Sequence, residues 1–390
     1  MTDLFAPLHS LENGCWFKLI CGASYQHLPA VRSLTLAYTL AGADCIDVAA
    51  DPAVIAAAKA GLQAAKNLTK AAQERGFDYQ GGSPLLMVSL NDGEDPHFRK
   101  AEFDAVHCPS DCLRPCERVC PAQAIAFNRK PDNFSGVESQ KCYGCGRCIP
   151  LCPYDIIYTR SYISTPEAIA PMVISTGVNA VEIHTQVGRL VEFQKLWQAI
   201  SPWAEQLQLL AISCPDGDGM IDYLKAIYEL ITPRPRTLIW QTDGRPMSGD
   251  IGDGTTTAAV KLGQKVLAAN LPGYVQLAGG TNSYTVAKLK AMGLLKRAGV
   301  QECKGTGVKE NSSPLSSPSP LSSSASIAGV AYGSYARVLL SPILEQLENK
   351  EVNYASVQGN VHLESEPDLL WEAVGLAYSL VSQIKSQQER

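Results

Sequence analysis

The chain has 390 residues, of which 46% are hydrophobic, 18% are charged and 13 are cysteines. That hydrophobic content excludes a disordered chain, and the 38 acidic residues, which outnumber 33 basic ones, exclude a polybasic nucleic-acid binder. At roughly 100–200 residues per domain, the length predicts two or three domains, or one large α/β domain that carries an insertion.

The sequence contains no run of about 18 apolar residues, so no membrane-spanning helix is predicted. The N-terminal segment carries acidic Asp3 and Glu12 and lacks the basic and then apolar pattern of a secretory signal. We therefore expect a cytoplasmic protein, in a compartment that keeps thiols reduced.

Eight of the 13 cysteines fall into two motifs, spaced C-x3-C-x3-C-x3-C-P and C-x2-C-x2-C-x3-C-P. The motifs consist of Cys108, Cys112, Cys116 and Cys120, and of Cys142, Cys145, Cys148 and Cys152. The second spacing is that of bacterial ferredoxins, in which three cysteines surround one [4Fe–4S] cluster. The fourth cysteine, which precedes a proline, ligates the other cluster.

Both motifs end in Cys-Pro, 32 residues apart, which indicates a duplicated ferredoxin module with one crossed ligand from each half. The module therefore has two predicted ligand sets: Cys108, Cys112, Cys116 and Cys152 for one cluster, and Cys142, Cys145, Cys148 and Cys120 for the other. Because the first motif has one extra residue in each of its first two gaps, its cluster is either [4Fe–4S] or [3Fe–4S].

Other interpretations of the cysteines are less favoured. Zinc motifs separate their ligand pairs by about 12–20 residues, and disulfides are disfavoured in a reducing compartment. His107 is expected to be solvated or hydrogen-bonded nearby rather than to be a ligand. The remaining cysteines are predicted to be small buried hydrophobic residues: Cys15, Cys21, Cys45, Cys214 and Cys303.

Outside the module, short apolar runs alternate with helical segments. The predicted strands are 19–24, 45–50, 85–90, 181–184, 209–214, 237–242, 274–278 and 327–332, and the clearest helices are 52–75, 166–176 and 368–384. Alternation of this kind predicts a parallel sheet with right-handed crossovers. Eight units favour a (β/α)8 barrel with the ferredoxin-like module inserted after the third strand. An open doubly wound sheet with the same module is the alternative.

The predicted organisation is a first part of the α/β domain at 1–103, a two-cluster iron–sulfur module at 104–160, and the rest of the α/β domain at 161–390. A Ser/Pro-rich insertion at 309–326 precedes the last strand. Nine of the 16 residues at 311–326 are serines and three are prolines, too polar a composition to form a core.

Glycines follow the last two predicted strands, at Gly279 and Gly280 and again at Gly333, which precedes Ser334. In barrels such positions often bind a phosphate or a flavin through backbone N–H groups, but they equally suit tight turns. The polar segment 242–250 is likewise either a ligand loop or a long turn.

Residues 107–121 and the run Cys142-Tyr-Gly-Cys-Gly-Arg-Cys-Ile-Pro-Leu-Cys-Pro-Tyr resemble the light-dependent period family of cyanobacteria, iron–sulfur proteins of circadian clock input. The resemblance extends over most of the chain, but only these two runs are specific. It implies a redox-responsive protein that reports photosynthetic state to the clock. The implied partners are circadian clock proteins and a clock-input kinase, with the quinone pool or a ferredoxin as the redox donor.

The favoured hypothesis is thus a redox sensor rather than an enzyme, in which cluster state changes how the module is seated on the barrel. Arginines in the cysteine loops either raise the cluster potential or are simply solvated: Arg114, Arg118 and Arg147. The alternative is a barrel oxidoreductase that binds a flavin or phosphate ligand and is fed by the ferredoxin module. Its candidate groups are His184, Asp243 and Arg245. A simple electron carrier is disfavoured, because two clusters need only about 60 residues.

Overall fold

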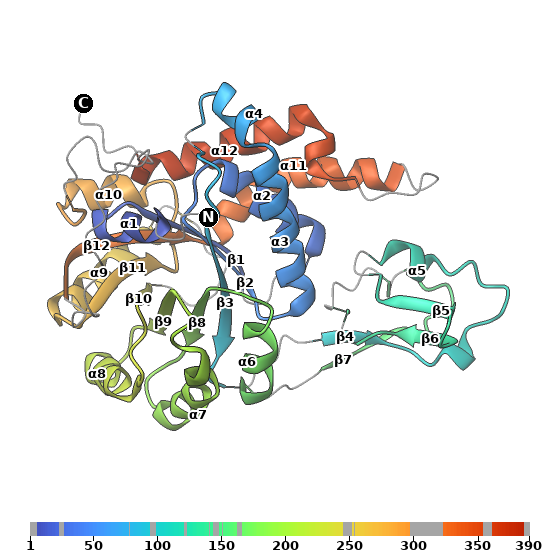
Figure 1. Ribbon diagram of the computed structural model, residues 1–390, viewed down its shortest axis with the longest axis horizontal. Helices are drawn as coiled ribbons and strands as arrows, with labels where there is room; N and C mark the ends of the chain where they lie inside the picture. The colour runs from blue at the N-terminus through green and yellow to red at the C-terminus, as the bar shows by residue number, and fades with distance from the viewer. Residues whose placement is uncertain are drawn as a thin grey trace.

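The computed structural model describes residues 6–22, 27–77, 79–93, 99–120, 123–139, 141–142, 148–149, 151–161, 166–244, 252, 254–296, 323–353 and 361–385. Eight strands close into one barrel, in the order β1, β2, β3, β8, β9, β10, β11 and β12, and every neighbouring pair is parallel (Figure 1). The predicted barrel is confirmed, and the open doubly wound sheet is wrong.

The barrel strands lie close to their predicted positions. They are β1 (Trp16–Gly22), β2 (Cys45–Ala49), β3 (Leu85–Asn91), β8 (Ala180–His184), β9 (Leu209–Pro215), β10 (Leu238–Asp243), β11 (Gly273–Ala278) and β12 (Ser323–Tyr332). The last strand begins earlier than predicted, because Ser323 already pairs with Gly273 of β11. A strand between two neighbours gains backbone hydrogen bonds whatever its side chains are, so the end of the predicted insertion 309–326 belongs to the sheet. Residues 309–322 lie outside the described part of the chain.

Helices surround the barrel, and the first of them lies at the end where the strands begin. They are α1 (Ala6–Asn13), α2 (Leu28–Leu40), α3 (Pro52–Asn67), α4 (Thr69–Glu74), α6 (Pro166–Ile174), α7 (Leu190–Ile200), α8 (Met220–Leu230), α9 (Thr256–Ala268), α10 (Thr285–Ala291), α11 (Ser334–Asn353) and α12 (Pro367–Lys385). None of the helices in the described part of the chain is long and apolar enough to cross a membrane.

The helix predicted at 52–75 is in fact two helices, α3 and α4. The start of α3 has the residues that are typical of a helix N-terminus. Pro52 is its first residue, and the Asp51 carboxylate accepts a hydrogen bond of 2.8 Å from the Ala53 N–H. The break comes at Leu68, beside Thr69, whose hydroxyl donates to the Lys66 carbonyl at 2.8 Å. Such a local hydroxyl bond competes with the helical backbone pattern.

Two apolar cores hold the barrel together. The larger lies between the outward faces of the strands and the surrounding helices. The smaller lies inside the barrel near the start of the strands, where Trp16, Leu85 and Ile239 pack with Leu11 of α1. The lower half of the barrel interior is therefore filled with apolar side chains and contacted by α1.

The inserted unit projects from the barrel on a two-stranded ribbon between β3 and β8 (Figure 1). In the ribbon, β4 (Arg99–Glu102) pairs antiparallel with β7 (Tyr158–Ser161). Beyond it lie a 3-10 turn (Ala105–His107), α5 (Pro115–Val119) and the hairpin of β5 (Ile125–Arg129) with β6 (Phe134–Val137). The predicted boundary at 103/104 falls just after β4, so the ribbon extends the unit by a few residues at its start.

Gly329 of β12 provides a test of the barrel packing. A Cβ at this position would lie 2.4 Å from the Trp16 carbonyl oxygen, which is backbone and cannot move aside. We expect Gly329→Ala to lower the free energy of unfolding by about 1–3 kcal/mol. Gly375→Ala in α12, where nothing lies within 4 Å of the new Cβ, should instead stabilise by up to about 1 kcal/mol. Denaturant unfolding of both variants measures this, and equal stabilities would contradict the packing described.

Candidate functional site: the cysteine module and the barrel mouth

The first cysteine motif is shaped by short-range backbone structure. The Asp104 carboxylate accepts a hydrogen bond of 3.0 Å from the Val106 N–H and so caps the 3-10 turn that precedes Cys108. The Cys112 N–H donates a hydrogen bond of 3.1 Å to the Pro109 carbonyl and so closes a turn. Cys116 then lies on α5, which begins at a proline. These features bend the chain around the thiols of the first motif.

Cys152, from the second motif, lies among the thiols of the first. Burial raises the pKa of the Cys116 thiol to about 11, and the nearby charges of Cys152, Cys108 and Cys112 add to that rise. The pKa of Cys108 is raised by burial too, then by Cys112, with Cys152 contributing. These four cysteines are the crossed set that the duplicated motif predicts, and that they share one cluster stays a prediction.

The described cysteines of the second set belong to the same small core that contains Cys116 and Cys152. Cys142 and Cys148 are buried in the small core of the inserted unit, and Cys120 packs against that core. Cys145 lies outside the described residues. Within the described residues, no three His, Cys, Asp or Glu side chains are arranged to hold a single metal ion.

Backbone amides point at several of the sulfurs. The Ala101 N–H donates to Cys142 Sγ at 3.3 Å, the Ala124 N–H to Cys120 Sγ at 3.2 Å, and the Arg114 N–H to Cys112 Sγ at 3.4 Å. Donors of this kind stabilise negative charge on a ligating thiolate. Soft thiolates with N–H donors therefore fit an iron–sulfur cluster.

The other groups singled out near the cysteines have structural partners. The Arg114 guanidinium lies 4.3 Å from the centre of the Phe127 ring, and Arg118 Nη2 donates to the Leu113 carbonyl at 2.9 Å. His107 is exposed, and its Nδ1 lies 3.9 Å from the Asp104 carboxylate; that it is not a ligand stays a prediction. Arg147 lies outside the described residues.

The scattered cysteines behave as small hydrophobic residues where the structure describes them. Cys15, Cys21, Cys45 and Cys214 are all buried, which confirms that expectation. Cys303 lies outside the described residues.

The glycine turns after the last two strands have structural explanations. Gly279 and Gly280 both have positive φ, and a Cβ on Gly280 would lie 3.0 Å from the Thr255 carbonyl oxygen. Gly333 precedes Ser334, the first residue of α11. Whether either turn binds a phosphate stays a prediction. In the polar loop 242–250, residues 245–250, including Arg245, lie outside the described residues.

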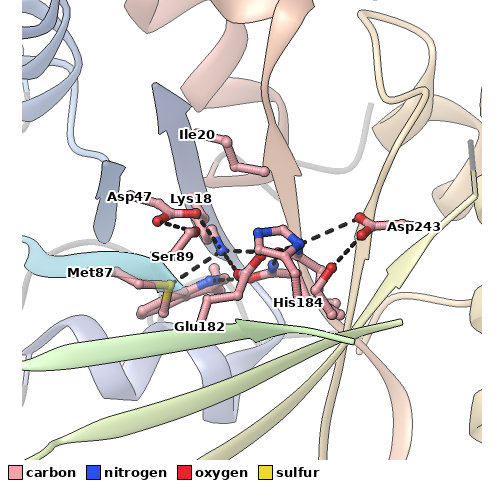
Figure 2. A network of polar contacts seen from close by, with 12 residues as sticks. Lys18, Ile20, Asp47, Met87, Ser89, Glu182, His184 and Asp243 are labelled. Atoms are coloured by element: carbon pink, nitrogen blue, oxygen red, sulfur yellow. Dashed lines mark hydrogen bonds and ion pairs between the residues drawn. The ribbon is translucent and has the colours of Figure 1, made fainter. Parts of the chain in front are cut away.

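A buried polar network crosses the barrel above its apolar half (Figure 2). Lys18 of β1 is fully buried, and its Nζ lies 3.1 Å from Asp47 Oδ2 and also pairs with Glu182. Burial alone would lower the pKa of Lys18, but the two carboxylates outweigh burial and raise that pKa above its usual value. Lys18 therefore stays protonated, because a buried ammonium is stable only with such partners.

His184 links this network to solvent at the barrel mouth (Figure 2). Its Nε2 lies 3.2 Å from Glu182 Oε1, and its side chain is 24% exposed. Gln241 Nε2 donates to the same Glu182 oxygen at 2.7 Å, and the Ser213 hydroxyl donates to Asp243. A histidine oriented by a buried carboxylate can accept or donate a proton, so this network is suited to acid–base chemistry.

Sequence reasoning found His184 and Asp243 but missed the groups beneath them. No functional role was predicted for Lys18, Asp47 and Glu182, which lie in strands that are otherwise mostly apolar. The available signal was their shared position, since each is the third residue of its strand, and in β8 His184 follows Glu182 by two residues at the carboxyl end. Ligand sites of barrels lie at that end.

Comparison with known proteins identifies the family. Residues 108–163 match the model of the LdpA Fe-S cluster-binding domain, and residues 172–383 match that of the Light dependent period A C-terminal domain. A curated relative from Synechococcus elongatus, Light dependent period A, is 48% identical over 97% of this chain and 94% of its own length. The chain belongs to the Light dependent period A family. The resemblance inferred from the cysteine motifs is thus confirmed.

As a Light dependent period A family member, the protein is an iron–sulfur protein, and its cluster-binding domain contains both cysteine motifs. Shorter matches are to subunits of a reductase and of a dehydrogenase. A tetrathionate reductase subunit of Salmonella typhimurium is 36% identical over 61 residues, 16% of this chain and 22% of that protein. The formate dehydrogenase iron-sulfur subunit of Wolinella succinogenes is 34% identical over 68 residues, 17% of this chain and 32% of that protein.

Asp47 makes the barrel network testable by pH. Burial raises the pKa of Asp47 to about 6, although Lys18 opposes the rise. The folded protein therefore holds this proton more tightly than the unfolded chain does, where an Asp has a pKa near 3.9. Stability should fall as pH rises from about 4 to about 6, by about 3 kcal/mol for this group.

Asp47→Asn should remove this contribution, so that the stability difference between wild type and variant changes over that pH window and is constant above it. Denaturant unfolding at a series of pH values measures the difference. Asp222→Asn, on the exposed face of α8, is the matched control and should follow the wild type. Parallel pH profiles for wild type and Asp47→Asn would contradict the burial of this carboxylate.

Proposed function

We propose that the protein is a cytoplasmic redox sensor of photosynthetic state that acts in circadian clock input through two iron–sulfur clusters. The observation that carries the proposal is the position of Cys152 among the thiols of the first motif. Membership of the Light dependent period A family supports the clock-related context and clock proteins as partners. The donor set suits [4Fe–4S] clusters, with [3Fe–4S] as the alternative at the first motif.

A bound cluster supplies a change of one electron, and hence of one unit of charge, at its sulfurs. This change of charge acts on the fold through hydrogen bonds that the backbone donates to the cysteine sulfurs. Ala101 lies on β4, in the ribbon that joins the inserted unit to the barrel, and its N–H donates to Cys142 Sγ. More negative sulfur strengthens this hydrogen bond, so the reduced state favours an ordered ribbon. An ordered unit then presents a different surface to a partner.

A second candidate function is supported by the network in the barrel. A protonated Lys18 fixes Glu182, and Glu182 orients His184 toward the mouth. This arrangement suits acid–base chemistry on a small ligand, as expected of a barrel oxidoreductase fed by its ferredoxin-like module. A flavin absorption spectrum in the purified protein would favour this candidate.

Crossed ligation predicts which cluster each substitution damages. Cys152→Ser should remove the cluster of Cys108, Cys112 and Cys116, and Cys120→Ser should remove the other, because serine is a poor donor to iron. Iron and acid-labile sulfide should fall by about half in each variant, and paramagnetic resonance of the reduced protein should show a different cluster lost.

Cys214→Ser, which changes a buried cysteine of β9, is the matched control and should keep both clusters. Damage by Cys152→Ser to the cluster of its own motif alone would refute the crossing. Stoichiometric zinc without labile sulfide in the wild type would refute the iron–sulfur assignment.

Sensing predicts that cluster state changes the order of the inserted unit. Limited proteolysis of 103–160 should be several-fold faster in Cys120→Ser, in Cys152→Ser and in oxidised protein than in reduced wild type. The barrel should resist cleavage equally in all of them. Identical cleavage rates across cluster states would refute sensing by this route.

A further inference from the structure

The chain that leads into the inserted unit is fixed to the barrel at Asp92, the residue that follows β3. Its backbone N–H donates to the His184 carbonyl at 3.1 Å, and its carboxylate accepts a hydrogen bond from the Thr185 hydroxyl. The same carboxylate lies 3.1 Å from Nη1 of Arg189. The ribbon strand β4 begins at Arg99, seven residues further along the chain. These contacts therefore anchor the root of the inserted unit to the end of β8.

The burial of the Asp92 carboxylate depends on Arg189. The side chain of Asp92 is fully buried, whereas that of Arg189 is 36% exposed. Burial raises the pKa of Asp92, and the hydrogen bonds from Thr185 and Arg189 oppose the rise, while Glu192 adds to it. Removing one partner of a buried ion pair leaves an uncompensated buried charge, which is strongly unfavourable. Without Arg189 the carboxylate is therefore more stable in solvent, and Asp92 leaves the end of β8.

Asp92 is also connected to the polar network at the barrel mouth. Thr185, whose hydroxyl donates to the Asp92 carboxylate, donates its backbone N–H to the Ser213 carbonyl at 2.9 Å. The Ser213 hydroxyl in turn donates to Asp243, which lies beside His184 at the mouth (Figure 2). Because the His184 carbonyl accepts from the Asp92 N–H, movement of Asp92 would loosen the support of His184 as well.

Gly93 leaves room for this ion pair. A Cβ at this position would lie 2.8 Å from Arg189 Cζ and closer still to Nη1. The clash would be with the end of a flexible side chain rather than with backbone, and the φ angle of Gly93 is not in the positive range that favours glycine. A methyl group at Gly93 would thus push the guanidinium away from Asp92 while the protein keeps every charge and its fold.

We propose that the Asp92–Arg189 pair is a latch through which the order of the inserted unit is transmitted to His184 at the barrel mouth. This proposal rests on the proposed function, because it assumes that the clusters order the inserted unit. With the latch closed, Asp92 is buried and His184 is held beside Glu182. An ordered ribbon already restricts the chain that follows Asp92, so closing the latch costs less conformational entropy. Cluster loss raises that cost and favours the open latch.

Two measurements on the full chain test the latch, each made with the clusters loaded and again after the iron is removed with a chelator. Hydrogen exchange at the Asp92 amide reports the latch itself. The rate at which diethyl pyrocarbonate modifies His184, followed by mass spectrometry, reports the barrel mouth, because this side chain is 24% exposed. His9 on α1, whose side chain is 65% exposed, is the internal control for the reagent.

The test variants open the latch in two independent ways. Gly93→Ala displaces the guanidinium without changing a charge, and Arg189→Gln removes the charge. Gly82→Ala, where nothing lies within 4 Å of the new Cβ, is the matched control. Iron and acid-labile sulfide should equal those of the wild type in all three variants, because none of these residues belongs to the cysteine motifs.

In the wild type, removal of iron should speed exchange at Asp92 and modification of His184 by about tenfold, while His9 reacts at the same rate. In Gly93→Ala and Arg189→Gln both rates should already be high with the clusters loaded, and removal of iron should not raise them further. Gly82→Ala should follow the wild type. Amides within the pairing of β3 with β8 should stay unchanged in every sample, because the latch lies beyond the last paired residues.

Unchanged exchange at Asp92 after iron removal, in wild-type protein whose inserted unit is then cleaved faster, would overturn the latch and leave the proposed function intact. Faster exchange at Asp92 without a change at His184 would overturn transmission to the barrel mouth. A full wild-type response in both latch variants would overturn the role of the Asp92–Arg189 pair. Absence of iron and sulfide from the wild type would instead overturn the proposed function, and the latch proposal with it.

Discussion

The inserted unit buries cysteine sulfur where an ordinary small domain buries hydrocarbon. Of the nine described residues in its buried core, four are cysteines: Cys116, Cys142, Cys148 and Cys152. A unit of about 60 residues is too small to be stable on a modest core alone, and such units commonly rely on a metal or on disulfides. Binding of an iron–sulfur cluster to these cysteine sulfurs would therefore contribute directly to the free energy of folding. For this reason a change at the clusters can alter the order of the whole unit.

The barrel provides the opposite kind of stability. Its large hydrocarbon core is independent of the sulfurs, and β3 pairs directly with β8, the strand that follows the insertion. The barrel thus closes without help from the inserted unit. In the described part of the chain, the ribbon of β4 and β7 lies between the two parts (Figure 1). A stable platform and a responsive unit joined at one ribbon form an arrangement suited to a switch.

The sequence predicted the barrel and the iron–sulfur module because both depend on strong repeating patterns. Apolar runs of four to six residues alternate with helices, and two motifs repeat the same Cys-Pro ending. Weak patterns were missed. The ribbon strands Arg-Lys-Ala-Glu and Tyr-Thr-Arg-Ser are short and polar, and they are held by pairing between distant segments. Such pairing cannot be read from either segment alone.

The barrel network was missed for a related reason. Lys18 within Trp-Phe-Lys-Leu-Ile-Cys-Gly is a single charge in an apolar strand, and its carboxylate partners lie on two other strands. Their contact depends on closure of the barrel, which brings β1, β2 and β8 around a common interior. Chemistry assembled from distant strands becomes visible only once the topology is known.

Hydrogen exchange at the Ala101 and Ala124 amides tests most directly whether the sulfurs order the inserted unit. Both N–H groups donate to cysteine sulfur, at 3.3 Å and 3.2 Å. These amides should exchange slowly in cluster-loaded protein, and about tenfold or more faster after the iron is removed with a chelator. Amides in the pairing of β3 with β8 should stay unchanged. Equal protection of the Ala101 and Ala124 amides in loaded and iron-free protein would contradict the claim that the cluster-binding sulfurs order the inserted unit.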